Sequence, residues 1–400
     1  MSAILVYMRT LILISGLGML YSCSVNEKTV DVTIENPLSY PRHNETVELS
    51  SDSILNLLGA AHCYVTDCNG REIPSQITYD RLLIFQADVD GDGRASYSIH
   101  PSDTMHVYSP VTTGRIYPER ADDIAWENEY VGFRIYGPTT QAKGEKAFGY
   151  DIFFKHPTPQ PVLEKLYEPE TNPRTWEIRD SLLAISKEMA DSFVYTISYH
   201  IDHGLGMDCY AVGPTLGAGV AALTDNDTIC YAWCYKDAQI LDNGPLRFTV
   251  KLDFAPTRIG SDCTVTESRV ITLDAGSHLN RCDVSYAGLT APRNVVAGFP
   301  LRDDNTPLTD KNKGIIVYAD PTQGTDNGKA LLGIIMPDAT DTLSIDNHIT
   351  ATTSILPDST LRYYWGFAWD RADIADKESW MSHLYNQASH ISSPLKVSIK

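Results

Sequence analysis

The stretch Arg247-Phe-Thr-Val-Lys-Leu-Asp-Phe254 alternates polar and apolar side chains over its whole length. Successive side chains of a β-strand point to opposite faces of the sheet, whereas an amphipathic helix repeats its apolar positions every three to four residues. The stretch therefore predicts a strand with one face buried in a core and the other turned away from it.

Ten further short runs of strand character recur along the chain, with turn residues between them. They cover residues 30–34, 81–86, 96–99, 131–136, 150–155, 193–200, 269–273, 314–318, 331–336 and 362–369. One convincing helix, residues 377–392, follows Asp376 as N-cap and places Trp380 and Leu384 on one face. This pattern predicts an all-β fold, a large antiparallel β-sandwich with few helices. We expect one domain over residues 23–400, in which residues from about 30 to 105 can pack as an N-terminal β subdomain.

The N-terminus has the features of an export signal. Arg9 precedes an apolar run over residues 10–21, which ends at Ser22-Cys23. A positive residue, a short apolar core and a small residue before the break are typical of a secretory signal peptide, and the run is too short to span a bilayer as a helix. Cys23 resembles the lipidated cysteine of a bacterial lipobox, although Tyr21 is unusual there. We expect a signal peptide over 1–22, lipidation of Cys23 and an outer-membrane lipoprotein, periplasmic or at the cell surface; plain secretion is the alternative.

Composition and charge narrow the class of protein. A mean hydropathy of −0.20 argues against an integral membrane protein, so the expected membrane contact is the lipid anchor alone. Removing residues 1–22 removes one positive charge, which changes the net charge from −19 to −20. Nucleic acid is not an expected partner, because phosphate binding needs a basic surface. An anionic small substrate stays possible, since it needs only a local cluster of arginine and lysine.

Seven cysteines follow Cys23. Cys63 and Cys68 flank a predicted hairpin and could pair, as could Cys230 or Cys234 with another cysteine, but we favour buried free thiols. The chain has no CxxC or Cys/His ligand spacing, so we expect no zinc site, no other metal and no cofactor.

Asp88-Val-Asp90-Gly-Asp92-Gly93 resembles the start of a calcium loop. An EF-hand needs a carboxylate at the twelfth position, where this chain has Ile99. We therefore expect a tight acidic turn between two strands.

A charged loop leads into the strand over residues 131–136. Period two places Val131, Phe133 and Ile135 on one face and Arg134 and Tyr136 on the other. The same alternation places Asp151 and Lys155 on one face of the strand over residues 150–155. Such charges can form a surface ion network, or they can line a sugar cleft. The candidate substrate-binding residues are Arg115, Glu119, Arg120, Asp123, Trp126, Glu127, Lys155 and His203.

The segment 193–200 is interpreted as a strand that ends at His200 on its polar face. Gly204 and Gly206 then let the chain turn back toward Asp208. Two histidines three residues apart would share a helical face, but this Gly-Leu-Gly sequence breaks a helix, so a metal pair loses its geometric support. A histidine at a strand end suits general acid/base work, because its pKa lies near neutrality.

Three segments together resemble one known family. Arg115-Ile-Tyr-Pro-Glu-Arg-Ala-Asp-Asp-Ile-Ala-Trp-Glu-Asn128, Phe133-Arg-Ile-Tyr-Gly-Pro138 and Tyr199-His-x-Asp-x-Gly-x-Gly-x-Asp-x-Tyr-x-Val-Gly-Pro214 are similar to the family called domain of unknown function 4861. The resemblance implies a secreted or lipid-anchored protein associated with polysaccharide degradation, a galactose-mutarotase-like supersandwich, and a link to dehydration of terminal uronic acids in ulvan oligosaccharides. Two departures are a variant Gly149–Lys155 segment and Leu205, where the family has an acidic residue.

We therefore expect a lyase or dehydratase that acts on anionic, uronic-acid-containing oligosaccharides by C5 proton abstraction and C4 elimination. Arg134 or Arg120 would neutralise the sugar carboxylate and His200 would be the base. Tyr136 or Tyr210 would be the acid, and Asp208 or Asp202 would orient the imidazole. We also expect His200 and Arg134 to face one cleft, with Tyr210 near its rim.

Two alternatives stay open. A non-catalytic glycan-binding lipoprotein would use Trp126, Trp176 or Trp233 as stacking platforms. A glycoside hydrolase would need two carboxylates, for which Glu119, Glu127, Asp123 and Asp208 are candidates.

Overall fold

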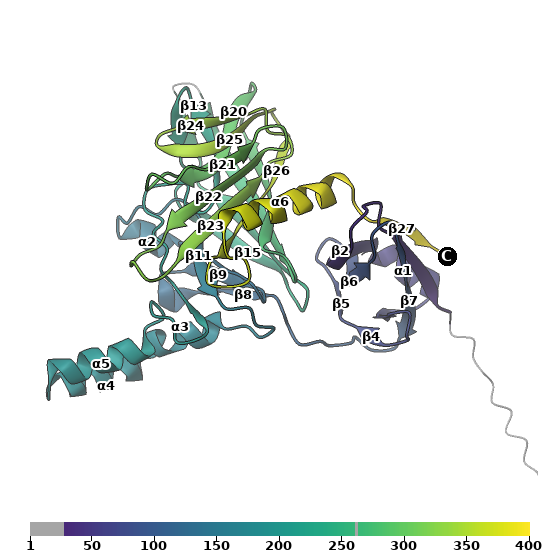
Figure 1. Cartoon of the computed structure of the whole chain (residues 1–400), viewed down its shortest axis with the longest axis horizontal. Coiled ribbons are helices and arrows are strands. Elements are labelled where there is room, and N and C mark those ends of the chain that lie inside the picture. The colour runs from purple at the N-terminus through teal and green to yellow at the C-terminus, as the bar shows by residue number, and fades with distance from the viewer. Residues whose placement is uncertain (1–27, 261–262) are drawn as a thin grey trace, which may run out of the picture.

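The structure, a computed structural model, describes residues 28–260 and 263–400. The expected signal peptide and Cys23 lie outside the described residues. Figure 1 shows two sheet-rich bodies beside each other, with the paired helices α4 and α5 projecting from the larger body.

The smaller body contains the N-terminal strands. One sheet has the order β27-β1-β7-β3-β4 and the other β2-β6-β5. Their bounds are β1 (Val30–Glu35), β2 (Arg42–Ser50), β3 (His62–Thr66), β4 (Glu72–Ile73), β5 (Ser75–Ile77), β6 (Leu82–Val89), β7 (Arg94–Ser102) and β27 (Lys396–Ile399), with helix α1 (Ser51–Leu58). This body has its own hydrophobic core, which includes Val32, Ile54 and Phe85. The last strand of the chain, β27, pairs antiparallel with β1, so the C-terminal segment completes the N-terminal sheet.

The larger body is a sandwich of antiparallel sheets. A nine-stranded sheet has the order β15-β16-β18-β19-β26-β23-β22-β21, with β17 on β18. Two five-stranded sheets have the orders β12-β11-β10-β9-β8 and β14-β13-β20-β25-β24. One core cluster with Trp126, Phe248 and Trp365 joins the three sheets. The prediction of a large antiparallel β-sandwich is confirmed.

The strands of the sandwich have the following bounds. They are β8 (Thr113–Tyr117), β9 (Asp123–Glu127), β10 (Gly132–Ile135), β11 (Asp151–Lys155), β12 (Gly206–Met207), β13 (Ala221–Asp225), β14 (Thr228–Cys230), β15 (Tyr235–Asn243), β16 (Arg247–Phe254), β17 (Thr257–Ile259), β18 (Cys263–Asp274), β19 (Leu279–Ala287), β20 (Arg293–Pro300), β21 (Leu308–Asp310), β22 (Ile315–Pro321), β23 (Lys329–Ile335), β24 (Asp341–Ile345), β25 (His348–Ile355) and β26 (Thr360–Trp369).

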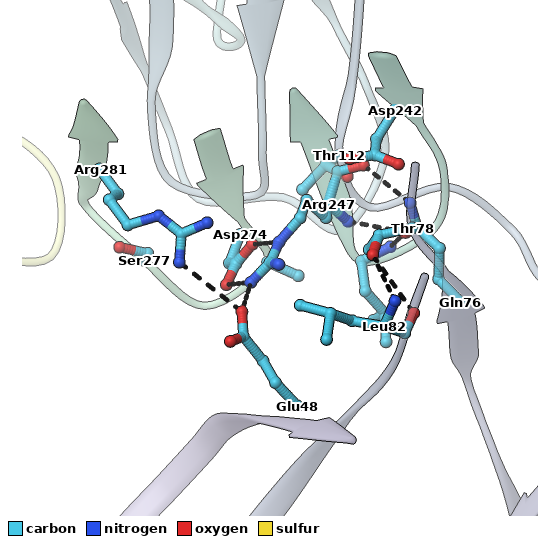
Figure 2. A network of polar contacts seen from close by, with 12 residues as sticks. Glu48, Gln76, Thr78, Leu82, Thr112, Asp242, Arg247, Asp274, Ser277 and Arg281 are labelled. Carbon is cyan, nitrogen blue, oxygen red and sulfur yellow. Dashed lines mark hydrogen bonds and ion pairs between the residues drawn. The ribbon is translucent and has the colours of Figure 1, made fainter. Parts of the chain in front are cut away.

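Strand β16 is the alternating stretch that predicted the fold. Its apolar residues Phe248, Val250 and Leu252 are fully buried, as the alternation requires. Arg247, the first residue of β16, is also buried, because the smaller body covers the outer face of the nine-stranded sheet at this position. Its guanidinium lies 2.7 Å from Glu48 of β2 and donates to Asp274 of β18 (Figure 2).

Helix α6 (Lys377–Ser392) has the predicted bounds. Asp376 is its N-cap and accepts a hydrogen bond of 2.7 Å from the backbone of Ser379. Trp380 and Leu384 pack on the outer face of β22 and β23. The helix then leads toward the smaller body, where β27 follows (Figure 1).

Helices that the strand patterns did not predict include α3 (Leu163–Thr171), α4 (Pro173–Leu183) and α5 (Lys187–Ile197), with α2 (Pro138–Ala142) and the 3₁₀ turn η1 (Pro118–Arg120) elsewhere. The predicted strand over residues 193–200 is wrong, because this segment is the end of α5 and a turn. Ser186 caps α5 by accepting from the backbone of Glu188, and α4 packs beside it. Capping and helix pairing therefore override a local alternation that favours a strand.

The acidic segment Asp90–Gly93 is a tight turn between β6 and β7, as expected. Cysteines 63, 68, 209, 230, 234 and 282 are free, and Cys209, Cys234 and Cys282 among them are buried. No helix within residues 28–260 and 263–400 is long and apolar enough to cross a membrane.

Candidate functional site

The outer face of the sheet β12-β11-β10-β9-β8 carries a buried polar cluster around Arg134. Phe133 and Ile135 of β10 point into the sandwich core, so Arg134 projects from the opposite face, as predicted. Its Nε donates to Asp151 on the neighbouring strand β11 at 2.9 Å, and its Nη2 donates to the Tyr136 hydroxyl at 2.8 Å. The carboxylates of Asp208 and Asp123 lie 3.3 and 3.9 Å from the guanidinium.

Three carboxyl groups thus surround one arginine, and burial affects their protonation. Burial raises the pKa of Asp123 to about 6, against the opposing attraction of Arg134. Burial also raises the pKa of Asp151 to about 6, and repulsion from Asp208 acts in the same direction. Burial raises the pKa of Tyr136 as well, so this phenol stays protonated. The charge of Arg134 is already neutralised by its neighbours, which makes it an organiser of the cluster.

Arg120 has a different environment. Its guanidinium packs over the rings of Tyr167 and Tyr199, at 3.9 and 4.7 Å from the ring centroids. Its Nη2 donates to the Tyr199 hydroxyl at 3.0 Å. No carboxylate of the described residues forms an ion pair with Arg120. Its positive charge is therefore available to an anionic group of a ligand.

The backbone next to Arg120 is strained. Ala121 and Asp122 have φ angles of 58° and 61°, in the left-handed region that non-glycine residues rarely adopt. A Cβ on Gly137 would lie 2.2 Å from the Asp122 carbonyl oxygen, so this turn also requires a glycine at position 137. Strain of this kind is concentrated at functional sites, where the surrounding fold holds it.

His200 is exposed in the turn after α5. Its Nδ1 lies 2.8 Å from the backbone carbonyl oxygen of Asp208. A carbonyl only accepts hydrogen bonds, so Nδ1 carries the hydrogen and the neutral ring presents the lone pair of Nε2 outward. The expectation that the Asp208 carboxylate orients the imidazole is wrong, because that carboxylate pairs with Arg134. Asp202 does not orient it either, since its carboxylate pairs with His156 at 2.8 Å.

Glycines close the loop that carries His200. Gly204 and Gly206 have φ angles of 93° and 124°. A Cβ on Gly206 would lie 2.0 Å from the Phe154 carbonyl oxygen. The loop therefore returns closely against β11, where the amide of Asp208 donates to the Tyr199 carbonyl at 2.9 Å.

Tyr199 brings Arg120 and His200 together. Its ring centroid lies 4.7 Å from Arg120 Cζ and 4.3 Å from the His200 centroid. Arg120 Cζ is therefore no more than 9.0 Å, the sum of 4.7 and 4.3 Å, from the imidazole centroid. One sugar ring with its hydrogen bonds can bridge groups at this separation. Asp208 links His200 to Arg134, since its carbonyl contacts the first and its carboxylate the second.

Two predicted site residues lie away from this cluster. Trp126 is fully buried in the sandwich core and donates to Asn280 at 2.9 Å, so its expected contact with substrate is wrong. Tyr210 is 3% exposed and lies under the guanidinium of Arg302 at 4.9 Å, so its expected place at a rim is also wrong. Both side chains point into the protein rather than toward a ligand.

Glu127 and Lys155 are structural. Lys155 Nζ lies 2.5 Å from Glu127, and neither side chain is more than 1% exposed. Glu127 also accepts from the backbone amides of Val162 and Leu163, at the start of α3. The expected contact of this pair with substrate is wrong, because the pair anchors α3 to the sheet beneath it.

The other predicted binding residues are at the surface. Arg115 donates to Glu119 at 2.6 Å and to Glu164 at 2.8 Å, beside a cavity of about 250 Å³. His203 is exposed and its Nε2 lies 2.9 Å from the Tyr195 carbonyl. These side chains are accessible, but their contacts do not join them to the Arg134 cluster.

Sequence reasoning missed Asp151, Tyr167 and Tyr199 as members of the site. Asp151 stands directly opposite Arg134 in the sheet, which strand pairing alone reveals. Tyr167 lies on α3, a helix that the strand pattern did not predict. Tyr199 begins the segment that resembles the known family, and that was the one available signal. Among the described residues, no group of three or more His, Cys, Asp or Glu side chains is arranged to hold a metal ion.

Solved structures show which known folds this chain shares. An α-mannosidase from Enterococcus faecalis V583 is similar over 94% of this chain, with a TM-score of 0.50 and 9% identity. A protein of glycosyl hydrolase family 38 from Enterococcus faecalis has the same TM-score, identity and coverage of this chain. The chain spans about half the length of these two structures, 46% and 48%. At this identity the similarity concerns the fold alone.

Sequence comparison identifies the family. A protein called uncharacterized protein P7, from Formosa agariphila, is 25% identical over 392 residues, which cover 92% of this chain and 93% of that protein. The profile of the family described as domain of unknown function (DUF4861) matches residues 34–397, most of the chain and all three motifs that suggested it. This protein belongs to the DUF4861 family.

Proposed function

We propose that this protein is a lyase or dehydratase that acts on uronic acid residues of oligosaccharides. The observation that carries the proposal is the pair Arg120 and His200. Arg120 is a cation without a carboxylate partner among the described residues, and it lies within 9.0 Å, the sum of 4.7 and 4.3 Å, of an imidazole with an outward Nε2.

This pair meets the first demand of the reaction. The C5 proton of a uronic acid is only weakly acidic, and a cation on the sugar carboxylate stabilises the negative charge that develops when the proton leaves. Arg120 would bind the carboxylate and Nε2 of His200 would take the C5 proton. Arg134 was the other candidate for the clamp, but its guanidinium is held by Asp151, Asp208 and Tyr136.

The second demand is an acid at C4. The Tyr136 hydroxyl donates to Asp151 at 2.9 Å and accepts from Arg134, so both of its roles are occupied. The Tyr199 hydroxyl accepts from Arg120, and its own hydrogen is free to donate. Tyr199 would protonate the oxygen that leaves C4. The C5–H and C4–O bonds break and a C4=C5 double bond forms. The leaving group is water in a dehydratase or a sugar hydroxyl in a lyase.

The fold supports carbohydrate as the substrate class, since two structures named after glycoside hydrolase activity share it. It does not favour a hydrolase, because each of the four candidate carboxylates already faces a cation of the protein. Asp123 and Asp208 lie against Arg134, at 3.9 and 3.3 Å. Glu127 pairs with Lys155 and Glu119 pairs with Arg115.

Turnover of saturated glucuronyl and iduronyl oligosaccharides tests the proposal. We expect the far-ultraviolet absorbance of a conjugated double bond to appear and His200→Gln to abolish it, while oligosaccharide binding persists. Reducing sugar released without this absorbance would identify a hydrolase. Binding without turnover in the wild-type protein would identify a glycan-binding protein, in which the partly exposed Trp176 and Trp233 are the remaining stacking candidates.

We also propose that the protein is exported and anchored to the outer membrane through Cys23. The Ser22-Cys23 sequence after an apolar run supports this proposal. Palmitate labelling of the protein in a bacterial host should be lost in Cys23→Ser. Equal labelling of the wild-type protein and Cys23→Ser would contradict lipidation at Cys23, and the protein would then be secreted without an anchor or anchored at another residue.

A further inference from the structure

A second cavity lies where the two bodies meet, away from the Arg134 cluster. Its volume is about 350 Å³, within the range of small-molecule sites. Its floor is the outer face of the nine-stranded sheet, and its walls are β2 of the smaller body and the C-terminal half of α6. Figure 2 shows part of the polar network beside it, with Glu48 of β2 reaching toward Arg247 and Arg281.

The floor is a row of polar side chains across four neighbouring strands. Residues directly opposite each other on paired strands share a face. Arg247 stands opposite Asp274, Thr272 opposite Arg281, and Arg281 opposite Tyr364. The same outer face is apolar where α6 packs on β22 and β23, around Val317. The sheet therefore changes from an apolar to a polar surface where the cavity begins.

The two arginines of this row differ in their partners. Arg247 is saturated, since it contacts Glu48 at 2.7 Å and donates to both oxygens of Asp274 at 2.6 and 2.8 Å. Arg281 makes a longer contact with Glu48, of 3.7 Å, and its Nε is buried without a hydrogen-bond partner. Nε2 of His390, on α6, is also buried without a partner. Both residues line the cavity, where His390 Nδ1 lies 3.0 Å from Glu45 and the Arg281 side chain is 26% exposed, so the guanidinium of Arg281 can donate to a ligand there.

The charge of the cavity selects the ligand. Arg247 and Arg281 line the cavity with Glu45, Glu48 and Asp274, and buried Arg42, which pairs with Glu45 from outside the cavity, balances the third carboxylate. An anion would have to approach Glu48 and Asp274, whereas a hydroxyl group can both donate to a carboxylate and accept from a guanidinium. Half-buried Tyr364 adds an aromatic surface that suits the C–H face of a sugar ring.

We propose that this cavity binds one neutral sugar ring, as a saccharide-binding site separate from the proposed catalytic site. Ring hydroxyls would accept from Arg281 and contact His390, with Tyr364 beneath the ring. Both bodies contribute residues, so a bound sugar also stabilises their contact. The site does not depend on lyase chemistry. It would bind a neutral sugar residue of a glycan whose uronic acid residues bind at the proposed catalytic site.

The test is saturation-transfer NMR on the full chain with glucose, galactose, mannose, xylose and rhamnose, and with glucuronate as the anionic arm. We expect at least one neutral sugar to bind and Arg281→Ala to weaken that binding about tenfold or more, the effect of one lost charged hydrogen bond. Arg362→Ala is the matched control. Arg362 pairs with Asp283 on the same sheet and is 55% exposed, but it does not line the cavity, so affinity should be unchanged.

Two results would overturn the proposal: no binding of any neutral sugar, or binding that Arg281→Ala leaves intact. Stronger binding of glucuronate at this site would overturn the assignment to a neutral ring. If Arg281→Ala does not fold, Arg281→Met keeps the aliphatic stem and gives the same test. Loss of uronide turnover in His200→Gln with sugar binding retained would separate the two sites.

Discussion

Lys155 and Glu127 form an ion pair of 2.5 Å in which both side chains are almost fully buried, 0% and 1% exposed. The pair holds α3 in place, since Glu127 also accepts from the amides of Val162 and Leu163. Helix α3 in turn carries Tyr167, on which Arg120 packs. A buried ion pair therefore connects the sandwich to the proposed carboxylate clamp.

Lys155→Met should destabilise the protein by about 3–5 kcal/mol, because it leaves the Glu127 carboxylate buried and without its cation. Urea unfolding followed by tryptophan fluorescence measures this loss. The matched control is Lys165→Met on the exposed side of α3, which should change stability by about 0.5 kcal/mol or less. Equal effects of the two substitutions would show that the buried pair is not a structural anchor.

Tyr199→Phe should lower kcat on uronide substrates about 10²-fold or more, since it removes the proposed acid. Arg120→Gln should lower kcat/KM by about 10²–10³, because the charge that develops at the sugar carboxylate loses its cation. Arg179→Gln, at an exposed ion pair on α4, is the control and should retain full activity. Full activity of Tyr199→Phe would show that another group, and not Tyr199, protonates the leaving oxygen.

Asp123→Asn should stabilise the protein at neutral and higher pH. Burial raises the folded-state pKa of Asp123 to about 6 from an ordinary value of 3.8, so folding favours the protonated form. The stabilising contribution of this carboxyl is present at low pH and is lost as pH rises through about 6. A shift of roughly two pKa units corresponds to at most about 3 kcal/mol. The gain in Tm should therefore be larger at pH 8 than at pH 5, and a gain that grows as pH falls would contradict the raised pKa.

Trp126→Ala should cost about 3–5 kcal/mol of stability, the usual range for a truncated aromatic in a core. Trp126 stacks on Phe133 and Phe248 at centroid distances of 5.7 and 5.9 Å. Trp126→Phe should fold and bind oligosaccharides with unchanged affinity in titration calorimetry. A tenfold loss of affinity in this folded variant would show that Trp126 stacks on a sugar ring, in contradiction to its burial in the core.

Deleting residues 395–400 should loosen the smaller body while the sandwich stays folded. The deletion removes β27, which pairs with β1, and Leu395, which packs against the N-terminal core. Cys63 packs against the same core and reports on it. A thiol reagent should modify Cys63 faster after the deletion, while Cys282, buried in the sandwich, stays protected as the internal control. Unchanged labelling of Cys63 would show that β27 is dispensable.

The sequence alone determined the elements whose pattern is local. The alternation in residues 247–254 and the capped amphipathic helix α6 follow from neighbouring side chains, and both have the predicted bounds. The same reasoning failed for residues 193–200, where a strand-like alternation belongs to the capped helix α5. When a short segment is compatible with both a strand and a helix, the element that packs against it determines its secondary structure, and here that element is α4.

For the candidate site, alternation correctly placed Arg134 on the face opposite Phe133 and Ile135. It could not show that the guanidinium is already held by Asp151, which only strand pairing places beside it. Nor could it show that Arg120, without a carboxylate partner among the described residues, lies against Tyr199 and near His200. The chain sets which side of a strand a residue faces, because that depends on backbone geometry. Which charges meet there, and which of them stay open to a ligand, depends on segments far apart in sequence, so only the tertiary structure decided it.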